Sequence, residues 1–216
     1  MISEFCKSTP LKSAYSSYYE EEELRMKKRI GKWIGLLLVI CQLTISAYAS
    51  SSFPDVSDTA PYAEAVSLMR EYGIFNGDAN GNFNPNSGIT RAEFAAIICR
   101  MVGGEGEIQM QVESSFNDVP ADHWAAGYVG WAVKNEIISG YGDGRYGPSD
   151  FVTYEQAIKM TVCAAGYGDA ALDAGGWPDG YVDVANGLGL LTGVDETPGA
   201  PMTRANVAVM ISNLFL

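Results

Sequence analysis

Apolar residues recur at helical spacing in two kinds of segment that alternate along the chain. In the first kind the apolar positions are Tyr62, Ala65, Val66, Met69 and Tyr72. That segment ends at Gly73, a residue type that commonly stops a helix. The second kind carries Phe94, Ile97, Ile98 and Met101 on one face. Between them, residues 77–85 are rich in glycine and Asx residues, which favour turns, and Phe83 can fold back as an apolar plug. The pattern predicts a helix, a loop and a second helix.

This unit is repeated three times. A hexad introduces the second helix of each unit, and the three hexads are Gly88–Glu93, Phe151–Gln156 and Pro201–Asn206. A threonine at the third position and a Glu or Gln three residues later, as in the first two hexads, predict a capping box. The period is about 50 to 63 residues. A unit this short buries too little apolar surface to stand alone, so we expect the units to fold by packing on one another.

Further linked motifs precede the hexads. They are Phe53-Pro54-Asp55-Val56, Phe116-Asn117-Asp118-Val119 with Asp122-His123-Trp124-Ala125, and Gly140-Tyr141-Gly142-Asp143-Gly144. From about Phe53 to Leu216 the chain resembles the S-layer homology family, a bacterial module that usually occurs three in a row and anchors exported proteins to the cell wall. The resemblance implies an all-α fold. Its three helix-loop-helix repeats, residues 50–108, 109–168 and 169–216, would form a pseudo-threefold, three-pronged bundle.

The residues before the repeats have the pattern of an export signal. Residues 26–49 combine a basic start, an apolar stretch from Ile34 to Ile45 and the small-x-small motif Ala47-Tyr48-Ala49. Because the apolar stretch is shorter than the roughly 20 residues that cross a bilayer, we favour a cleaved signal peptide over a membrane anchor. Residues 1–25 lie where the basic segment should come first, which suggests a misassigned upstream extension and a true start at Met26. The protein is therefore expected to be secreted and to reside at the cell wall.

Charge limits the possible partners. Without residues 1–49 the chain keeps seven Lys and Arg residues and 21 Asp and Glu residues, a net charge of about −14. So acidic a chain repels nucleic acid and anionic lipid at long range. The wall polymers that the family binds are also anionic, so attraction has to come from a few cations placed locally. We expect no nucleic-acid partner, no membrane span after cleavage, and a monomer with an internal pseudo-trimer.

Catalysis and cofactor binding have little support. The sequence has one histidine, His123, and its place beside Trp124 is more typical of packing at a helix start than of a general base. The loop that begins at Asp78 would place Ile89 where a calcium-binding loop needs its bidentate glutamate. Cys99 and Cys163 fall within predicted helices without metal-ligand spacing, and we favour free thiols over a disulfide. No enzyme activity, metal or cofactor is predicted.

The resemblance implies recognition of a secondary cell-wall polysaccharide, typically one that carries a pyruvate ketal, in grooves between adjacent repeats. Arg91 and Arg204 share the fourth hexad position, and we expect free N–H groups beside them at the helix start. The alternative for each arginine is an intramolecular or solvated guanidinium. The remaining candidate binding residues are Asp55, Asp118, Trp124, Gly77, Gly140 and Tyr141. Trp131 and Trp177 are weaker candidates for stacking on a sugar.

Departures from the family pattern predict that the grooves are not equivalent. Tyr154 replaces the arginine in the second hexad, Pro61-Tyr62 stands where His-Trp would be in the first repeat, and the third repeat lacks a clear Phe-x-Asp-Val opening. A second function also stays open, because the repeats of a structural or assembly protein of the cell envelope would pair with other proteins instead of a saccharide. A large exposed apolar patch would favour that alternative.

Overall fold

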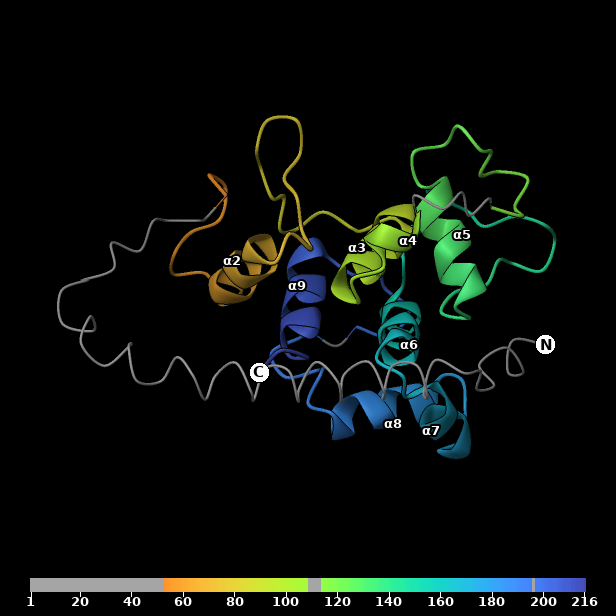
Figure 1. The fold of residues 1–216 in the computed structure, drawn as a ribbon. Helices are drawn as coiled ribbons and strands as arrows, with labels where there is room; N and C mark the ends of the chain where they lie inside the picture. Colours follow the sequence, from red (N-terminus) through yellow and green to blue (C-terminus); the bar gives the residue numbers. More distant parts are fainter. Residues whose placement is uncertain (1–52, 109–113, 196) are drawn as a thin grey trace, which may run out of the picture. The chain divides into compact units, whose positions relative to one another are not determined.

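The computed structural model describes residues 53–108, 114–195 and 197–216, which form helices joined by loops (Figure 1). The predicted signal peptide and the upstream extension lie outside the described residues. Within the described ranges, no helix combines the length and apolar character that crossing a membrane requires.

The expectation of an all-α fold is confirmed. The helices are α2 (Ala63–Glu71), α3 (Arg91–Met101), α4 (Glu105–Ile108), α5 (Ala126–Lys134), α6 (Tyr154–Ala164), α7 (Gly168–Asp173), α8 (Asp179–Gly187) and α9 (Arg204–Ser212). Each hexad leads into the second helix of its repeat, as predicted, and Gly73 follows α2 with a φ of 70°. The short helices α4 and α7 were not predicted by the two-helix pattern. The boundaries of the repeats stay a prediction.

Threonines cap the three helices that follow the hexads. The Thr90 hydroxyl accepts the Glu93 N–H, and the Glu93 carboxylate accepts the Thr90 N–H in return at 2.8 Å. Thr153 and Gln156 make the same reciprocal pair at α6. Thr203 caps α9 by accepting the Asn206 N–H at 3.2 Å. The predicted capping boxes are therefore confirmed, and they fix where α3 and α6 begin.

The hexads are joined by a ring of backbone hydrogen bonds. The Ile89 N–H donates to the Met202 carbonyl, Met202 to Val152, and Val152 back to Ile89, at 3.0, 2.9 and 3.0 Å respectively. Short antiparallel bridges between the hexads flank these bonds. The three side chains are at most 2% exposed. We call Ile89, Val152 and Met202 the hexad ring, and it ties one segment from each repeat to the other two.

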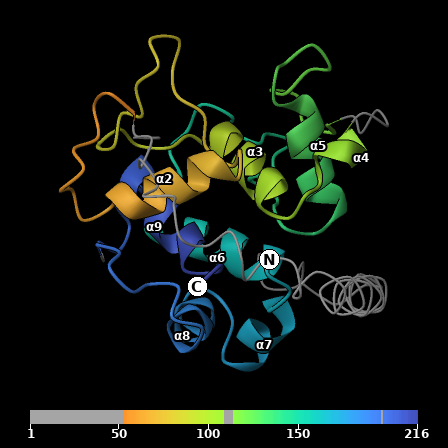
Figure 2. The same cartoon turned by 60° about the vertical axis from the view of Figure 1, so that its left-hand side comes forward.

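Helix packing follows the same cyclic order. The second helix of each repeat packs on the first helix of the next, so that α3 contacts α5, α6 contacts α8, and α9 returns to contact α2 (Figures 1 and 2). The apolar face of each repeat is therefore covered by a neighbouring repeat, as the short period required. The pseudo-threefold symmetry of the whole bundle stays a prediction.

In each of the first two repeats an aspartate carboxylate fixes the glycine-rich loop by accepting two of its backbone N–H groups, an arrangement that we call the loop latch. The Asp55 carboxylate accepts the N–H groups of Phe83 and Asn84 at 2.7 and 2.6 Å. Asp118 accepts those of Tyr146 and Gly147, both at 2.8 Å. Burial is the largest single influence and acts to raise the pKa of the Asp118 carboxyl, but backbone N–H groups, chiefly these two, and the Arg145 charge together hold the pKa below its usual value.

Aromatic side chains fill the space behind the latched loops. Phe83 is fully buried, with its ring centroid 5.2 Å from that of Phe53 and 5.5 Å from that of Phe75. The predicted plug is therefore confirmed. Within the described part of the chain, Cys99 and Cys163 form no disulfide. Burial raises the pKa of the Cys99 thiol to about 12, which keeps it protonated and unreactive at neutral pH.

Removing one repeat should remove the cover of the other two. A chain that lacks residues 53–102 loses α2 and α3, which exposes the apolar faces of α9 and α5. We expect this variant to unfold or to oligomerise, as measured by circular dichroism and size-exclusion chromatography with light scattering. A monomeric fragment that melts cooperatively at the temperature of the intact chain would contradict this expectation.

The Asp118 latch should weaken in acid. Because the folded-state pKa lies below the ordinary value of 3.8, the carboxylate stabilises the fold above about pH 4, and this contribution is lost as the pH falls through the folded-state pKa. Asp118→Asn should lower the urea midpoint at pH 5.5 and reduce the further loss on acidification to pH 2.5. Asp122→Asn is the matched control, since Asp122 is an exposed neighbour with no hydrogen bond to the described residues. An identical acid profile for Asp118→Asn and the wild type would show that the latch contributes nothing.

Candidate functional site

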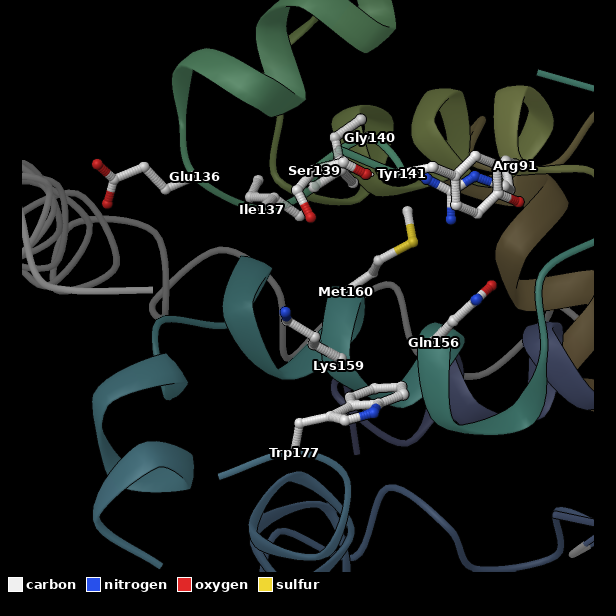
Figure 3. A pocket seen from close by; sticks show the side chains of 11 residues that line it. Arg91, Glu136, Ile137, Ser139, Gly140, Tyr141, Gln156, Lys159, Met160 and Trp177 are labelled. Atoms are coloured by element: carbon white, nitrogen blue, oxygen red, sulfur yellow. Dashed lines mark hydrogen bonds between the residues drawn. The ribbon is translucent and has the colours of Figure 1, made fainter. Parts of the chain in front are cut away.

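Two grooves among the described residues are assembled from the same four parts. Each combines a hexad arginine from one repeat, the loop between the two helices of the next repeat, the second helix of that repeat, and a tryptophan from the repeat after it. Groove 1 is lined by Arg91, residues 136–141, Gln156, Lys159, Met160 and Trp177 (Figure 3). Groove 2 is lined by Arg204, residues 74–78, Asn84, Ser87, Gly88, Glu93, Ala96, Ile97, Arg100 and Trp124.

In groove 1, Arg91 reaches across from the start of α3 to the loop of the second repeat. Its Nε donates to the Tyr146 carbonyl at 2.8 Å and its Nη2 donates to the Ser139 carbonyl at 2.9 Å. The guanidinium carbon lies 4.5 and 4.9 Å from the ring centroids of Tyr146 and Tyr141. Arg91 is only 6% exposed. The arginine therefore holds the loop in place and brings a positive charge to the wall of the groove.

Arg204 makes the equivalent contacts in groove 2. Its Nε donates to the Phe83 carbonyl at 2.6 Å, and its Nη2 donates to the Asn76 carbonyl at 2.9 Å. The Glu93 carboxylate lies 4.0 Å from Nη1. Burial is the larger effect and lowers the pKa of Arg204 below its usual value, although the nearby carboxylates act to raise the pKa. Both hexad arginines thus have the intramolecular partners that the sequence left as the alternative, and their contact with a ligand stays a prediction.

The expectation of free N–H groups at the helix start is wrong. The Arg91 N–H donates to the Asp150 carbonyl at 2.8 Å, and the Ala92 N–H donates to Pro148 at 3.1 Å. At α9 the N–H groups of residues 204 and 205 bond to carbonyls of the first repeat in the same way. These donors complete the junctions between repeats, because a buried N–H needs a partner and the neighbouring loop supplies it.

The predicted glycines and Tyr141 line the grooves. A Cβ on Gly140 would collide with the Phe116 ring and would lie 2.5 Å from the Arg145 carbonyl oxygen, and a Cβ on Gly77 would lie 3.0 Å from the Phe53 ring. Glycine therefore lets each loop lie directly on an opening phenylalanine. The exposed Tyr141 hydroxyl donates to Asp150 at 2.9 Å. By contrast, Asp55 and Asp118 lie outside both linings and serve as loop latches.

Tryptophans supply the exposed aromatic faces. Trp124 is 57% exposed in groove 2, and Trp177 is 38% exposed in groove 1, whereas Trp131 is buried in α5. The sequence indicated Trp124 but left Trp177 as a weak candidate, since the third repeat lacks the opening motif that would align the two. In both repeats the order along the chain is tryptophan, helix, glycine loop and hexad. This shared order is the signal that could have identified Trp177 as the counterpart of Trp124. Lys159 and Arg100 were missed because neither lies in a repeated motif.

His123 contributes to packing beside Trp124. Its Nδ1 accepts the Ala125 N–H at 3.1 Å, and its ring stacks on that of Trp124 with 5.9 Å between centroids. This is the helix-start role that the sequence favoured. Among the described residues, no group of three or more His, Cys, Asp or Glu side chains is placed to hold a metal ion.

Comparisons with known proteins agree with this architecture. The S-layer homology domain matches residues 52–95 and 115–158, which cover the first two repeats. The "Cell surface protein" of Thermoanaerobacter kivui is 33% identical over 188 residues, 86% of this chain and 24% of that protein. The "Middle cell wall protein" of Brevibacillus brevis is 31% identical over 87% of this chain and 18% of the relative. The "Cellulosome-anchoring protein" of Acetivibrio thermocellus is 27% identical over 64% of this chain and 34% of the relative.

The chain thus spans about a third or less of the length of these relatives. The likeness extends beyond the two matched domains, because 188 aligned residues exceed the length of two repeats. The two matched domains, the cyclic contacts between the capped hexads, and the relatives named for the cell surface and cell wall all indicate the same family. The chain belongs to the S-layer homology family.

Proposed function

We propose that this chain holds an exported protein non-covalently at the bacterial cell wall by binding secondary cell-wall polysaccharide in grooves 1 and 2. The observation that carries the proposal is the repetition of the same four parts in both grooves. Packing alone does not require an exposed tryptophan and a largely buried arginine in the same groove twice over. The printed names of the relatives, which refer to the cell surface, the cell wall and anchoring, support the same location for this chain.

The groove chemistry suits an anionic sugar. An exposed tryptophan face accepts the apolar side of a sugar ring, while the loop backbone and the charged arginine line the same groove. A pyruvate ketal adds one carboxylate to the sugar, and a carboxylate needs local positive charge because the chain as a whole is strongly acidic. Binding of this kind requires no bond to form or break, so the proposed role is that of an anchor and not of an enzyme.

Protein–protein contact is the second candidate. Tyr72 and Phe215 are 57% and 43% exposed, and their rings stack with 5.2 Å between centroids. Leu216 beside them is 94% exposed. An exposed apolar cluster of this kind favours docking to another protein. It lies outside both groove linings, so the two candidates can be separated by substitution.

The tryptophans should decide between these candidates. Replacing both Trp124 and Trp177 with Ala should release the protein from purified cell-wall sacculi in a pull-down, with each substitution weakening binding by about 1 kcal/mol. Because both side chains are exposed, melting should change little. Tyr72→Ala is the matched control for loss of an exposed aromatic outside the grooves. Wild-type binding that survived acid removal of the secondary polymer would count against the saccharide and favour protein contacts.

The arginines should affect both binding and stability. Arg91→Ala should weaken binding to pyruvylated polysaccharide by about 1.5 to 3 kcal/mol in calorimetric titration, and Arg204→Ala should weaken it less, because the Glu93 carboxylate already lies 4.0 Å from Arg204. Each should also lower the free energy of unfolding by about 1–3 kcal/mol, because two loop carbonyls lose their donors. Lysine should rescue only part of either effect, since a point charge cannot reproduce the planar fork. Wild-type affinity in the stably folded double variant would show that the arginines serve the fold alone.

A further inference from the structure

The two grooves share their parts but not their charges. The last hexad residue, which caps the helix in both repeats, is the acidic Glu93 in groove 2 and the neutral Gln156 in groove 1. Three residues further along the same helix, groove 2 has Ala96 where groove 1 has Lys159. Both differences make groove 1 more positive. Groove 1 is lined by two cationic and one anionic side chain, whereas groove 2 is lined by two of each.

The positive charges of groove 2 already have acidic neighbours. Arg204 lies 4.0 Å from the Glu93 carboxylate. Arg100 pairs with Glu105 through its Nε at 2.9 Å, and its Nη2 donates to the Tyr128 hydroxyl at 3.1 Å. Any ligand carboxylate that entered groove 2 would have to compete with these groups and would also meet Asp78. The net attraction for an anion in groove 2 is therefore small.

Groove 1 instead presents an ammonium group that has no carboxylate partner among the described residues. Lys159 lies on α6, and its Nζ lies 5.8 and 5.6 Å from the ring centroids of Trp177 and Tyr181. It forms no ion pair with any residue that the structure describes. Figure 3 shows Lys159 next to Trp177, with Glu136 and Arg91 toward opposite ends of the groove. The aromatic faces orient the ammonium but leave its three N–H donors for a ligand.

The two grooves also differ in size, and the longer side chain at this helical position contributes to the difference. Groove 1 encloses about 130 Å³ and groove 2 about 410 Å³. A lysine stem occupies space that Ala96 leaves open, so a ligand in groove 1 lies closer to the side chain that carries the charge. Charge and shape thus change together at one helical position.

We propose that Lys159 is the residue that selects the ligand carboxylate. It makes groove 1 the tighter, charge-selective site. Groove 2 binds the same polymer weakly and with little regard to charge. This inference rests on the proposed function. In groove 1 the sugar ring stacks on Trp177 while its carboxylate meets the Lys159 ammonium beside that ring. The buried Arg91 adds a positive field, but two of its N–H donors already serve loop carbonyls.

Calorimetry with a charged probe and its neutral form tests the assignment. The probe is a methyl hexoside that carries a pyruvate ketal, and the neutral form is the methyl ester of its carboxylate. The wild type should bind the acid at one tight site and one weak site, and the tight site should prefer the acid over the ester by about 10-fold. Lys159→Met, which keeps the aliphatic stem, should weaken the tight site about 10-fold and abolish the preference. Lys159→Arg should retain the preference.

Two further variants separate charge from folding. Gln156→Glu keeps the capping acceptor but gives groove 1 the acidic residue of groove 2, so it should also weaken the tight site. Lys134→Met removes an exposed lysine that lines neither groove and should change nothing. Tryptophan fluorescence assigns the sites, because Trp177→Phe removes the reporter of groove 1 and Trp124→Phe removes that of groove 2.

The possible outcomes are distinct. If neither probe binds and purified polysaccharide does not bind either, the proposed function fails and this inference fails with it. If the probe binds both grooves equally, or if Lys159→Met and Gln156→Glu keep the wild-type preference for the acid, the inference is overturned and the proposed function stands. A preference that is lost only when Lys159 loses its charge supports the inference.

Discussion

The ring of three backbone hydrogen bonds through Ile89, Val152 and Met202 is the constraint on which the rest of the structure depends. Each bond links two repeats, and no repeat can leave without breaking two of them. Because the three residues are buried in the intact fold, an N–H or carbonyl of the ring that lost its partner there would be costly. The ring therefore holds the threonine-capped starts of α3, α6 and α9 together, and the second helix of each repeat packs on the first helix of the next.

The grooves are a consequence of this closure. A groove needs an arginine from one repeat, a loop and helix from a second, and a tryptophan from a third, so no single repeat contains one. Arg91 and Arg204 follow directly after the ring residues and threonine caps, and each holds a loop carbonyl next to a groove glycine. Folding and ligand recognition are thus coupled through the same two guanidinium groups. This coupling explains how Arg91 can line a groove although it is only 6% exposed.

The sequence predicted local features well because each depends on neighbouring residues. The Thr90–Glu93 capping box, the helix stop at Gly73 and the Phe83 plug all follow from residue type and spacing. It could not predict what depends on a distant partner. Helical periodicity shows which face of α3 is buried but not that α5 covers that face. In the sequence the first N–H groups of α3 have no visible partner, because their acceptors, the carbonyls of Asp150 and Pro148, lie in another repeat. Trp177 was ranked below Trp124 because its place in groove 1 also depends on residues that are distant in the sequence.

The second hexad shows that the structural and chemical roles of these segments can be separated. Tyr154 takes the place of the arginine, yet its N–H still donates to the Ala200 carbonyl at 2.9 Å, and its side chain is 3% exposed. The junction therefore keeps its backbone bond and its packing while it loses the guanidinium. At the helical position of Lys159, the third repeat carries the apolar Val209. The hydrogen bonds of the ring involve only backbone groups. A side chain at a junction between repeats can therefore gain or lose charge without opening the bundle. In this way one repeated scaffold can carry grooves of unequal charge.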